Sequence, residues 1–210
     1  MPKLVLASSS PRRRELLAQA GFTFEVHPAQ INEDPRINES PFDLVVRLAR
    51  EKAEKVYAGQ NGRLGLDGVV LGADTTVTLD GAILGKPLDA EDAARMLRML
   101  SGRTHRVITG VAVVSAADPK GVSGAARGMR VEVAAEVTAV RFLTLSEDEI
   151  REYVASGEPM DKAGAYAIQG RAAKWIPRVE GCYFNVVGLP LALVSALLDG
   201  IWGKTDSNRR

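Results

Sequence analysis

The 210-residue sequence contains one cysteine, Cys182, and only two histidines, His27 and His105. A single thiol cannot form an intrachain disulfide, and zinc sites built from several thiolates are excluded as well. The two histidines lie far apart in the sequence, so a histidine-rich metal site is not expected either. We therefore interpret Cys182 as a small packed residue in a protein of a reducing compartment.

The chain also lacks an excess of either charge, because 27 Lys and Arg face 26 Asp and Glu. A protein that binds nucleic acid without sequence preference needs a basic excess to displace counterions from phosphates, so no nucleic-acid partner is expected. The hydrophobic share is 46% and the charged share 25%. Both values are ordinary for a globular protein and exclude a disordered chain.

Long apolar runs are missing too. No stretch reaches the ~18–20 residues that a membrane helix needs. The run Leu4–Ala7 is only four residues long, and three arginines follow at Arg12–Arg14, which is unlike a signal peptide. We expect a cytoplasmic protein with no membrane partner.

Short apolar segments alternate with amphipathic ones along the first half of the chain, and two long strands dominate the middle. Strands are predicted over 4–7, 22–26, 69–73, 75–79, 107–114 and 130–143, with a hairpin turn at Asp80-Gly81. Helices are predicted to begin after Ser10, Ser40, Asp89 and Ser146, and a last one covers 189–202. The segments 59–68, 118–121 and 161–187 are expected to be loops or mixed structure. The pattern predicts an α/β fold with a long mixed sheet, as one domain over 1–202 with a flexible tail over 203–210.

The first candidate for chemistry is the run Ser8-Ser9-Ser10-Pro11-Arg12-Arg13-Arg14, where a strand gives way to a helix. Free backbone N–H groups at a helix start favour anions, whereas cations are disfavoured there. A bound phosphate would resolve this conflict, since the guanidinium fork matches phosphate oxygens. The alternative is a solvated first turn with three surface arginines.

The second candidate is Asp74, a carboxylate that interrupts an apolar strand beside Gly72. An ionised carboxylate is costly to bury without a metal or hydrogen-bond donors. It could hold Mg²⁺ or take a proton from water. The alternative is an aspartate at the end of a strand that caps a turn.

Weaker candidates are spread along the chain. The string Gly81–Lys86 does not match a phosphate-binding P-loop, because its glycines are four apart and no Ser or Thr follows the lysine. Lys86 could still supply a point charge to a phosphate. Glu33 could be a solvated loop charge, Lys52 a residue at the edge of a helix stripe, and Gln169 either a reader of a base edge or a bridge across a turn.

Taken together, the motifs resemble the Maf family of nucleoside triphosphate pyrophosphatases. The matching strings span residues 4 to about 199 in the family's order. They are Leu4–Arg13, Gly72–Thr75, Gly85–Pro87, Gly102–His105, Thr109-Gly110, Ser156–Pro159, Asp161–Tyr166, Ile168–Gly170 and Asn185–Pro190.

The resemblance implies hydrolysis of a nucleoside triphosphate to the monophosphate and pyrophosphate, on the branch acting on dTTP and UTP. It implies a fold shared with inosine triphosphate pyrophosphatases, in which a long curved mixed sheet and two lobes enclose a cleft, and usually a homodimer. Two positions depart from the family. Asn32 stands where Asp is common, so only Glu33 carries over, and Ala172-Ala173 replaces a glycine-containing turn, which alanine does not favour.

The hypothesis is an in-line attack of water on the α-phosphorus. Asp74 is expected to be the general base, and Glu33 with Asp74 to bind a divalent metal, Mg²⁺ or else Mn²⁺ or Co²⁺. The residues expected to bind substrate are Ser8, Ser9, Arg12, Arg13, Lys52, Thr75, Lys86 and Gln169. One rival is a nucleotide-sensing regulator of cell division without turnover. The other, an RNA-binding module, is disfavoured by the neutral charge.

Overall fold

The computed structural model describes residues 3–60, 64, 68–117 and 128–202. The predicted tail 203–210, the predicted loop 118–121 and most of the loop 59–68 lie outside the described residues. The strands are β1 (Leu4–Leu6), β2 (Phe24–Val26), β3 (Val69–Leu79), β4 (Ala82–Leu84), β5 (Thr104–Ala116), β6 (Met129–Arg141) and β7 (Arg178–Glu180). The α-helices are α1 (Pro11–Gln19), α2 (Pro41–Gly59), α3 (Ala90–Leu100), α4 (Glu147–Ala155), α5 (Tyr183–Val187) and α6 (Leu191–Trp202).

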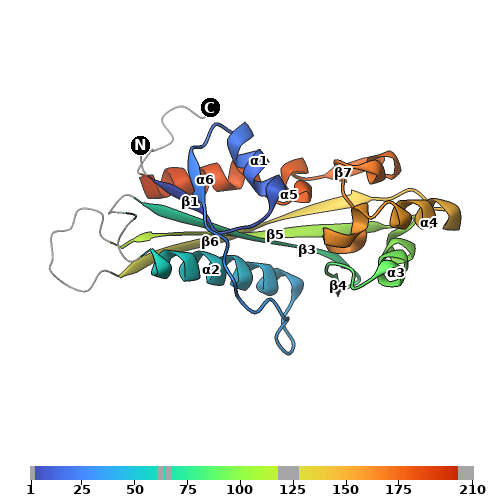
Figure 1. Ribbon diagram of the computed structural model, residues 1–210, viewed down its shortest axis with the longest axis horizontal. Helices are drawn as coiled ribbons and strands as arrows, with labels where there is room; N and C mark the ends of the chain where they lie inside the picture. The colour runs from blue at the N-terminus through green and yellow to red at the C-terminus, as the bar shows by residue number, and fades with distance from the viewer. Residues whose placement is uncertain (1–2, 61–63, 65–67, 118–127, 203–210) are drawn as a thin grey trace.

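In the described part of the chain the seven strands form one mixed sheet in the order β2-β1-β3-β5-β6-β7, and β4 adds to β3. Strand β1 is parallel to β2 and β3, whereas the long strands β3, β5 and β6 pair antiparallel. Figure 1 shows α2 on one face of the sheet and α1, α5 and α6 on the other, with α3 and α4 at one end of the long strands. The α/β fold with a long mixed sheet and two lobes is therefore confirmed.

Three buried apolar clusters hold these layers together. One lies between α2 and the sheet, and the second lies under α1 and α6 on the opposite face. The third fills the end lobe, where α3, α4 and the 3₁₀ segments pack around Phe142 and Trp175. None of the described helices has the length and hydropathy that would let it cross a membrane.

The predicted helix starts are confirmed by their caps. The side chains of Ser10, Ser40 and Asp89 each accept a hydrogen bond from the backbone N–H three residues on. Ser146 and Glu149 form a complete capping box at the start of α4. These caps fix where the helices begin, and for α1 this places the Ser8–Ser10 segment directly beyond the end of β1.

Strand β3 is much longer than its neighbours on one side, and this leaves a gap. β1 pairs with residues 69–71 of β3, and β4 pairs with residues 77–79. Within the described chain no strand pairs with the same edge of β3 over residues 72–76. That edge of the segment, which includes Asp74, is therefore left without a neighbouring strand, and its backbone is open to other partners such as the Arg13 side chain.

Helix α2 packs unusually close to the sheet, and two glycines permit it. A Cβ placed on Gly72 would lie 2.2 Å from the carbonyl oxygen of Ala49, and one on Gly110 would lie 2.2 Å from that of Val45. Gly110 pairs directly with Asp74 across β3 and β5. The carboxylate thus lies on the face that α2 covers, beside the point of closest approach.

The predicted mixed segment 161–187 folds into short elements that were not predicted individually from its sequence. It contains 3₁₀ helices η2 (Ala163–Ala165) and η3 (Arg171–Trp175), the strand β7 and the helix α5, and η1 (Glu158–Asp161) overlaps its start. Ala172 and Ala173 lie in η3 and neither has a positive φ. The turn formed by this chain therefore requires no left-handed residue at either position.

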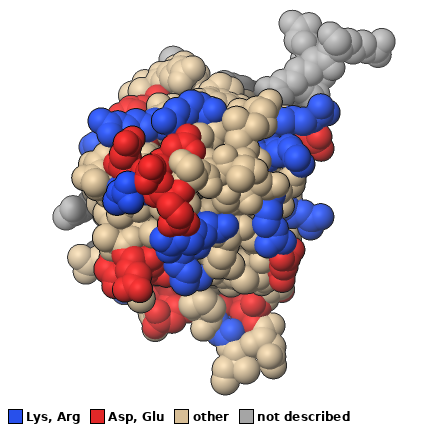
Figure 2. Space-filling model, turned by 90° about the vertical axis from the view of Figure 1, so that its right-hand side faces the viewer, with Lys and Arg blue, Asp and Glu red and all other residues tan. Residues whose placement is uncertain are grey.

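The end of the molecule that carries α3 and α4 has a surface of mixed charge. Figure 2 shows Lys and Arg interspersed with Asp and Glu across this face. Many of these residues form exposed ion pairs, such as Arg98 with Glu147 at 2.7 Å. Such pairs stabilise a fold by at most about 1 kcal/mol each. This face presents no broad basic surface of the kind that attracts nucleic acid.

The packing of α2 leads to a stability prediction. Gly110→Ala forces a methyl group against the α2 backbone, so we expect the free energy of unfolding in urea to fall by about 2 kcal/mol. Gly59→Ala is the matched control, because nothing lies within 4 Å of a Cβ at that position. Equal stability of the Gly110→Ala variant and the parent would show that α2 does not depend on this close approach.

Candidate active-site cleft

A cavity of about 540 Å³ opens between the two lobes, beside the unpaired edge of β3. Its lining includes every residue that the sequence nominated, although these come from six separate parts of the chain. They are Ser8, Ser9, Arg12, Arg13, Glu33, Lys52, Asp74, Thr75, Lys86 and Gln169. Their chemical roles remain predictions, but the predicted cleft is present and they share it.

Asp74, Lys52 and Glu33 form the acidic centre of the cleft. The Nζ of Lys52 lies 2.7 Å from Oδ1 of Asp74 and 2.7 Å from Oε1 of Glu33. The Lys52 side chain is 9% exposed, so it is a buried bridge between two carboxylates and not a residue at the edge of a stripe. Burial raises the pKa of Asp74, while the charges of Lys52 and Arg13 act in the opposite direction.

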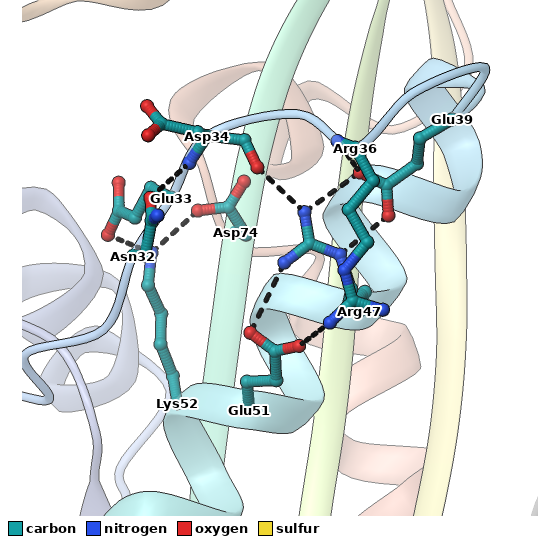
Figure 3. Close-up of polar contacts among 9 residues, drawn as sticks. All are labelled: Asn32, Glu33, Asp34, Arg36, Glu39, Arg47, Glu51, Lys52 and Asp74. Atoms are coloured by element: carbon teal, nitrogen blue, oxygen red, sulfur yellow. Dashed lines mark hydrogen bonds and ion pairs between the residues drawn. The ribbon is translucent and has the colours of Figure 1, made fainter.

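Glu33 reaches this centre from the segment between β2 and α2. The side-chain Oδ1 of Asn32 accepts a hydrogen bond from the backbone N–H of Asp34 at 2.9 Å, which forms a local turn around Glu33. An amide oxygen can accept this bond as a carboxylate would. Asn32 therefore supplies the acceptor for the turn that presents Glu33 (Figure 3).

Arg13 is bound by the protein itself, contrary to the alternative of a solvated surface arginine. Its Nε donates to the carbonyl oxygen of Gly188 at 2.9 Å. Its Nη1 donates to the Ala73 carbonyl at 2.9 Å and to Ser8 Oγ at 3.2 Å, and its Nη2 donates to Thr75 Oγ1 at 2.9 Å. Carbonyl oxygens and hydroxyls thus offset a cation at a helix start, and one of the five guanidinium N–H groups is left for a ligand.

The hydroxyls of Ser8 and Thr75 are set differently by these contacts. Ser8 Oγ accepts from Arg13 and from the backbone N–H of Ser10, so its own proton is available to donate into the cleft. Thr75 Oγ1 is engaged by Arg13 and by Thr109 Oγ1 at 2.9 Å. Thr75 therefore shapes the wall with a hydroxyl that the protein already uses.

The second lobe supplies the opposite wall. Lys86 is exposed and has no ion pair or hydrogen bond within the described chain, and neither does the Gln169 side chain. Arg12 lies 3.4 Å from Asp161, which also pairs with Lys162. Lys86 and Arg12 are thus the cations of the cleft that are least committed to the protein.

Three hydrogen bonds, one buried and two partly buried, hold this second wall in place. His105 is 1% exposed, and its Nε2 lies 2.7 Å from the hydroxyl of Tyr166, a residue of the wall. The backbone N–H of Ala167 donates to the hydroxyl of Tyr153 at 3.1 Å, and that hydroxyl donates to Glu158 at 2.8 Å. None of these four side chains was predicted from the sequence to be part of the site. Three of the residues, His105, Glu158 and Tyr166, nevertheless lie within the motif strings.

The fold and the cleft together define an α/β protein with a deep site in which cations surround a buried carboxylate. The family model described as "Maf-like protein" matches residues 3–201. The chain belongs to this family. Its relatives include the dTTP/UTP pyrophosphatase of Pelotomaculum thermopropionicum, which is 52% identical over 94% of this chain and 96% of the relative.

The chain is also similar to a second dTTP/UTP pyrophosphatase. The dTTP/UTP pyrophosphatase of Moorella thermoacetica is 50% identical over 97% of this chain and its own full length. Among solved structures, the Staphylococcus aureus Ham1 protein matches 94% of this chain and 98% of its own, with 13% identity and a TM-score of 0.44.

The environment of Arg13 predicts that two adjacent arginines differ in their effect on folding. Arg13→Met removes the donors of four hydrogen bonds, so we expect the free energy of unfolding in urea to fall by about 2–4 kcal/mol. Arg12→Met removes one partly exposed ion pair and should cost about 1 kcal/mol or less. Equal losses in the two variants would contradict the structural role of Arg13.

His105 predicts a dependence of stability on pH. Burial lowers its pKa from 6.5 to about 4. Between these values the unfolded chain binds a proton that the folded chain does not, so stability falls as pH drops from 6.5 to 4, by about 3 kcal/mol. Urea unfolding across this range should show a weaker slope in His105→Gln. An unchanged slope in His105→Gln would refute the assignment.

Proposed function

We propose that this protein hydrolyses nucleoside triphosphates of the dTTP and UTP class to the monophosphate and pyrophosphate. The observation that carries the proposal is a buried carboxylate, Asp74, on the open edge of β3 in a cleft that also holds Lys52, Arg12, Arg13 and Lys86. The name of the relatives at about 50% identity over nearly the whole chain points to the same reaction.

The triphosphate binds where donors and positive charge gather. The available proton of Ser8, the exposed Ser9 at the start of α1 and the cations Arg12 and Lys86 face a chain of about four negative charges. Arg13 contributes its remaining N–H and its charge, while its other donors fix Ser8 and the backbone of Ala73.

The reaction is an in-line displacement at the α-phosphorus. A water oxygen forms a bond to that phosphorus, and the bond to the oxygen bridging the α- and β-phosphorus breaks, so that pyrophosphate leaves. Asp74 accepts the proton of the attacking water. Burial makes its carboxylate a stronger base than an exposed aspartate, and Lys52 keeps it ionised and oriented. The cations stabilise the charge that develops on the phosphoryl oxygens.

The carboxylates of the centre also fit a divalent metal. The described residues contain no group of three or more His, Cys, Asp or Glu side chains placed to hold an ion by themselves. Mg²⁺ characteristically takes one or two carboxylates, completed by water and substrate phosphates, and Glu33 and Asp74 supply two oxygen donors within reach of one ammonium group. Bound Mg²⁺, or Mn²⁺ or Co²⁺ in its place, would neutralise phosphate charge and activate the electrophilic phosphorus.

The second wall of the cleft sets the preference for the nucleotide base. The uncommitted amide of Gln169 carries both donors and acceptors, which suits the edge of a pyrimidine, and Thr75 shapes the opposite side. The proposal further includes a cytoplasmic homodimer without nucleic-acid or membrane partners. The neutral overall charge argues against a nucleic-acid partner, and the single cysteine is consistent with a reducing compartment such as the cytoplasm.

The decisive experiment combines product analysis with a catalytic variant. Asp74→Asn should lower the rate of UTP hydrolysis by about 10²–10⁴-fold, because the general base is lost. Asp80→Asn is the control, since Asp80 lies exposed at the hairpin tip and outside the cleft lining.

Turnover in ¹⁸O-water should place the label in the monophosphate. Label in orthophosphate or in pyrophosphate would overturn attack at the α-phosphorus, and absence of turnover in the parent would favour a nucleotide sensor.

A further inference from the structure

Arg47 of α2 contacts the segment that carries Glu33 at several points, although it does not line the cleft. Its Nε and Nη2 donate to the two carboxylate oxygens of Glu39 at 2.6 and 2.8 Å. Nη2 also donates to the backbone carbonyl of Asp34 at 3.1 Å, and Nη1 to Glu51 at 3.2 Å. Figure 3 shows this guanidinium between the segment and the helix.

These contacts are well shielded for ion pairs near a surface. The Arg47 side chain is 13% exposed and that of Glu39 is 8% exposed. The hydrogen bonds from Arg47 hold the pKa of Glu39 at about 2, and the same contact raises the pKa of Arg47. Both groups are therefore charged at neutral pH, and their bidentate geometry fixes orientation as well as distance.

The segment that they hold has little other regular structure. Residues 27–40 contain no helix or strand between β2 and α2. Arg36 adds two contacts to the same cluster, from its backbone N–H to Glu39 at 2.9 Å and from Nη2 to Glu51 at 2.9 Å. The Glu33 side chain itself is 54% exposed, so packing alone does not fix its position.

We propose that Arg47 is a positioning residue that holds Glu33 at the reaction centre. Arg47 donates to the carbonyl of Asp34, the residue next to Glu33, and we call the contacts of Arg47 with this segment the clasp. Lys52 lies little more than one turn further along α2 and forms an ion pair with the Glu33 carboxylate. One rigid helix thus sets both the cation of the centre and the backbone that delivers its second carboxylate. This inference rests on the proposed function for its catalytic consequence, but the clasp itself is a property of the fold.

The test compares two arginines of the same helix. Arg47→Met removes the clasp, whereas the control Arg50→Met removes only an exposed pair with Glu54. We expect Arg47→Met to lower kcat for UTP by about 10- to 100-fold with a much smaller change in KM, because misplacement of a reacting group affects the chemical step. Arg50→Met should stay within about twofold of the parent, as expected for an exposed ion pair.

Hydrogen exchange gives a readout that does not depend on turnover. Backbone amides of residues 32–39 should exchange faster in Arg47→Met than in the parent or in Arg50→Met. Arg47→Lys should not rescue kcat, because a lysine cannot hold both Glu39 oxygens and the Asp34 carbonyl. If Arg47→Met fails to fold, Glu39→Gln weakens the same clasp and is expected to change kcat and exchange in the same direction.

The outcomes separate the clasp from the proposed function. Faster exchange with unchanged kcat, lower kcat with unchanged exchange, or full rescue by Arg47→Lys would each overturn the positioning role. If the parent releases no pyrophosphate, the proposed function fails, while the exchange measurement still decides whether Arg47 holds the segment.

Discussion

A carboxylate buried on a central strand needs a cation, a metal or hydrogen-bond donors to stay ionised, and here a helix lying across the sheet supplies a cation. Asp74 has Lys52 at 2.7 Å, and the contact forms because α2 lies almost directly on the backbone of β3 and β5. Gly72 and Gly110 make that approach sterically possible. The ionised state of Asp74 therefore depends on the close packing of α2 against the sheet.

Helix α2 organises the acidic half of the cleft. Its inner face packs on the sheet through Val45, Ala49 and Ala53, and Lys52 projects into the cavity. Its outer side carries Arg47, which holds the segment that contains Glu33. Residues that are distant in sequence thus converge because a single rigid element contacts all of them, and a charged site of this kind benefits from such pre-organisation.

The other half of the cleft depends on satisfying a cation at a helix start. Arg13 lies in the first turn of α1, where the helix dipole opposes it, and the structure offsets this with the carbonyl oxygens of Ala73 and Gly188. The Ala73 carbonyl is free to accept because β1 ends before that point of β3. The short first strand therefore leaves room for the arginine beside the cleft.

Local sequence signals were sufficient for the longer helices and strands. Caps such as Ser40 and Ser146, the Asp80-Gly81 turn and the apolar stripes act over a few residues, so they can be recognised from the chain alone. The resemblance of the motif strings then selected the residues that share the cleft. The strand β7 was not predicted, because its pairing depends on β6, more than 30 residues away in the sequence. The 3₁₀ helix η3 was not predicted either, and its Arg171 and Trp175 bind Glu158 and Glu149 of earlier elements.

The sequence by itself determined the α/β class and the starts of the helices, since these depend on neighbours within one or two turns. It also supplied the charged residues of the cleft. Only the tertiary structure decided that Lys52 is a buried bridge, that Arg13 is largely committed to the protein and that Arg47 holds the Glu33 segment. Those outcomes depend on distances between elements remote in sequence. Such distances are fixed by the packing of whole helices on the sheet, and no local pattern encodes them.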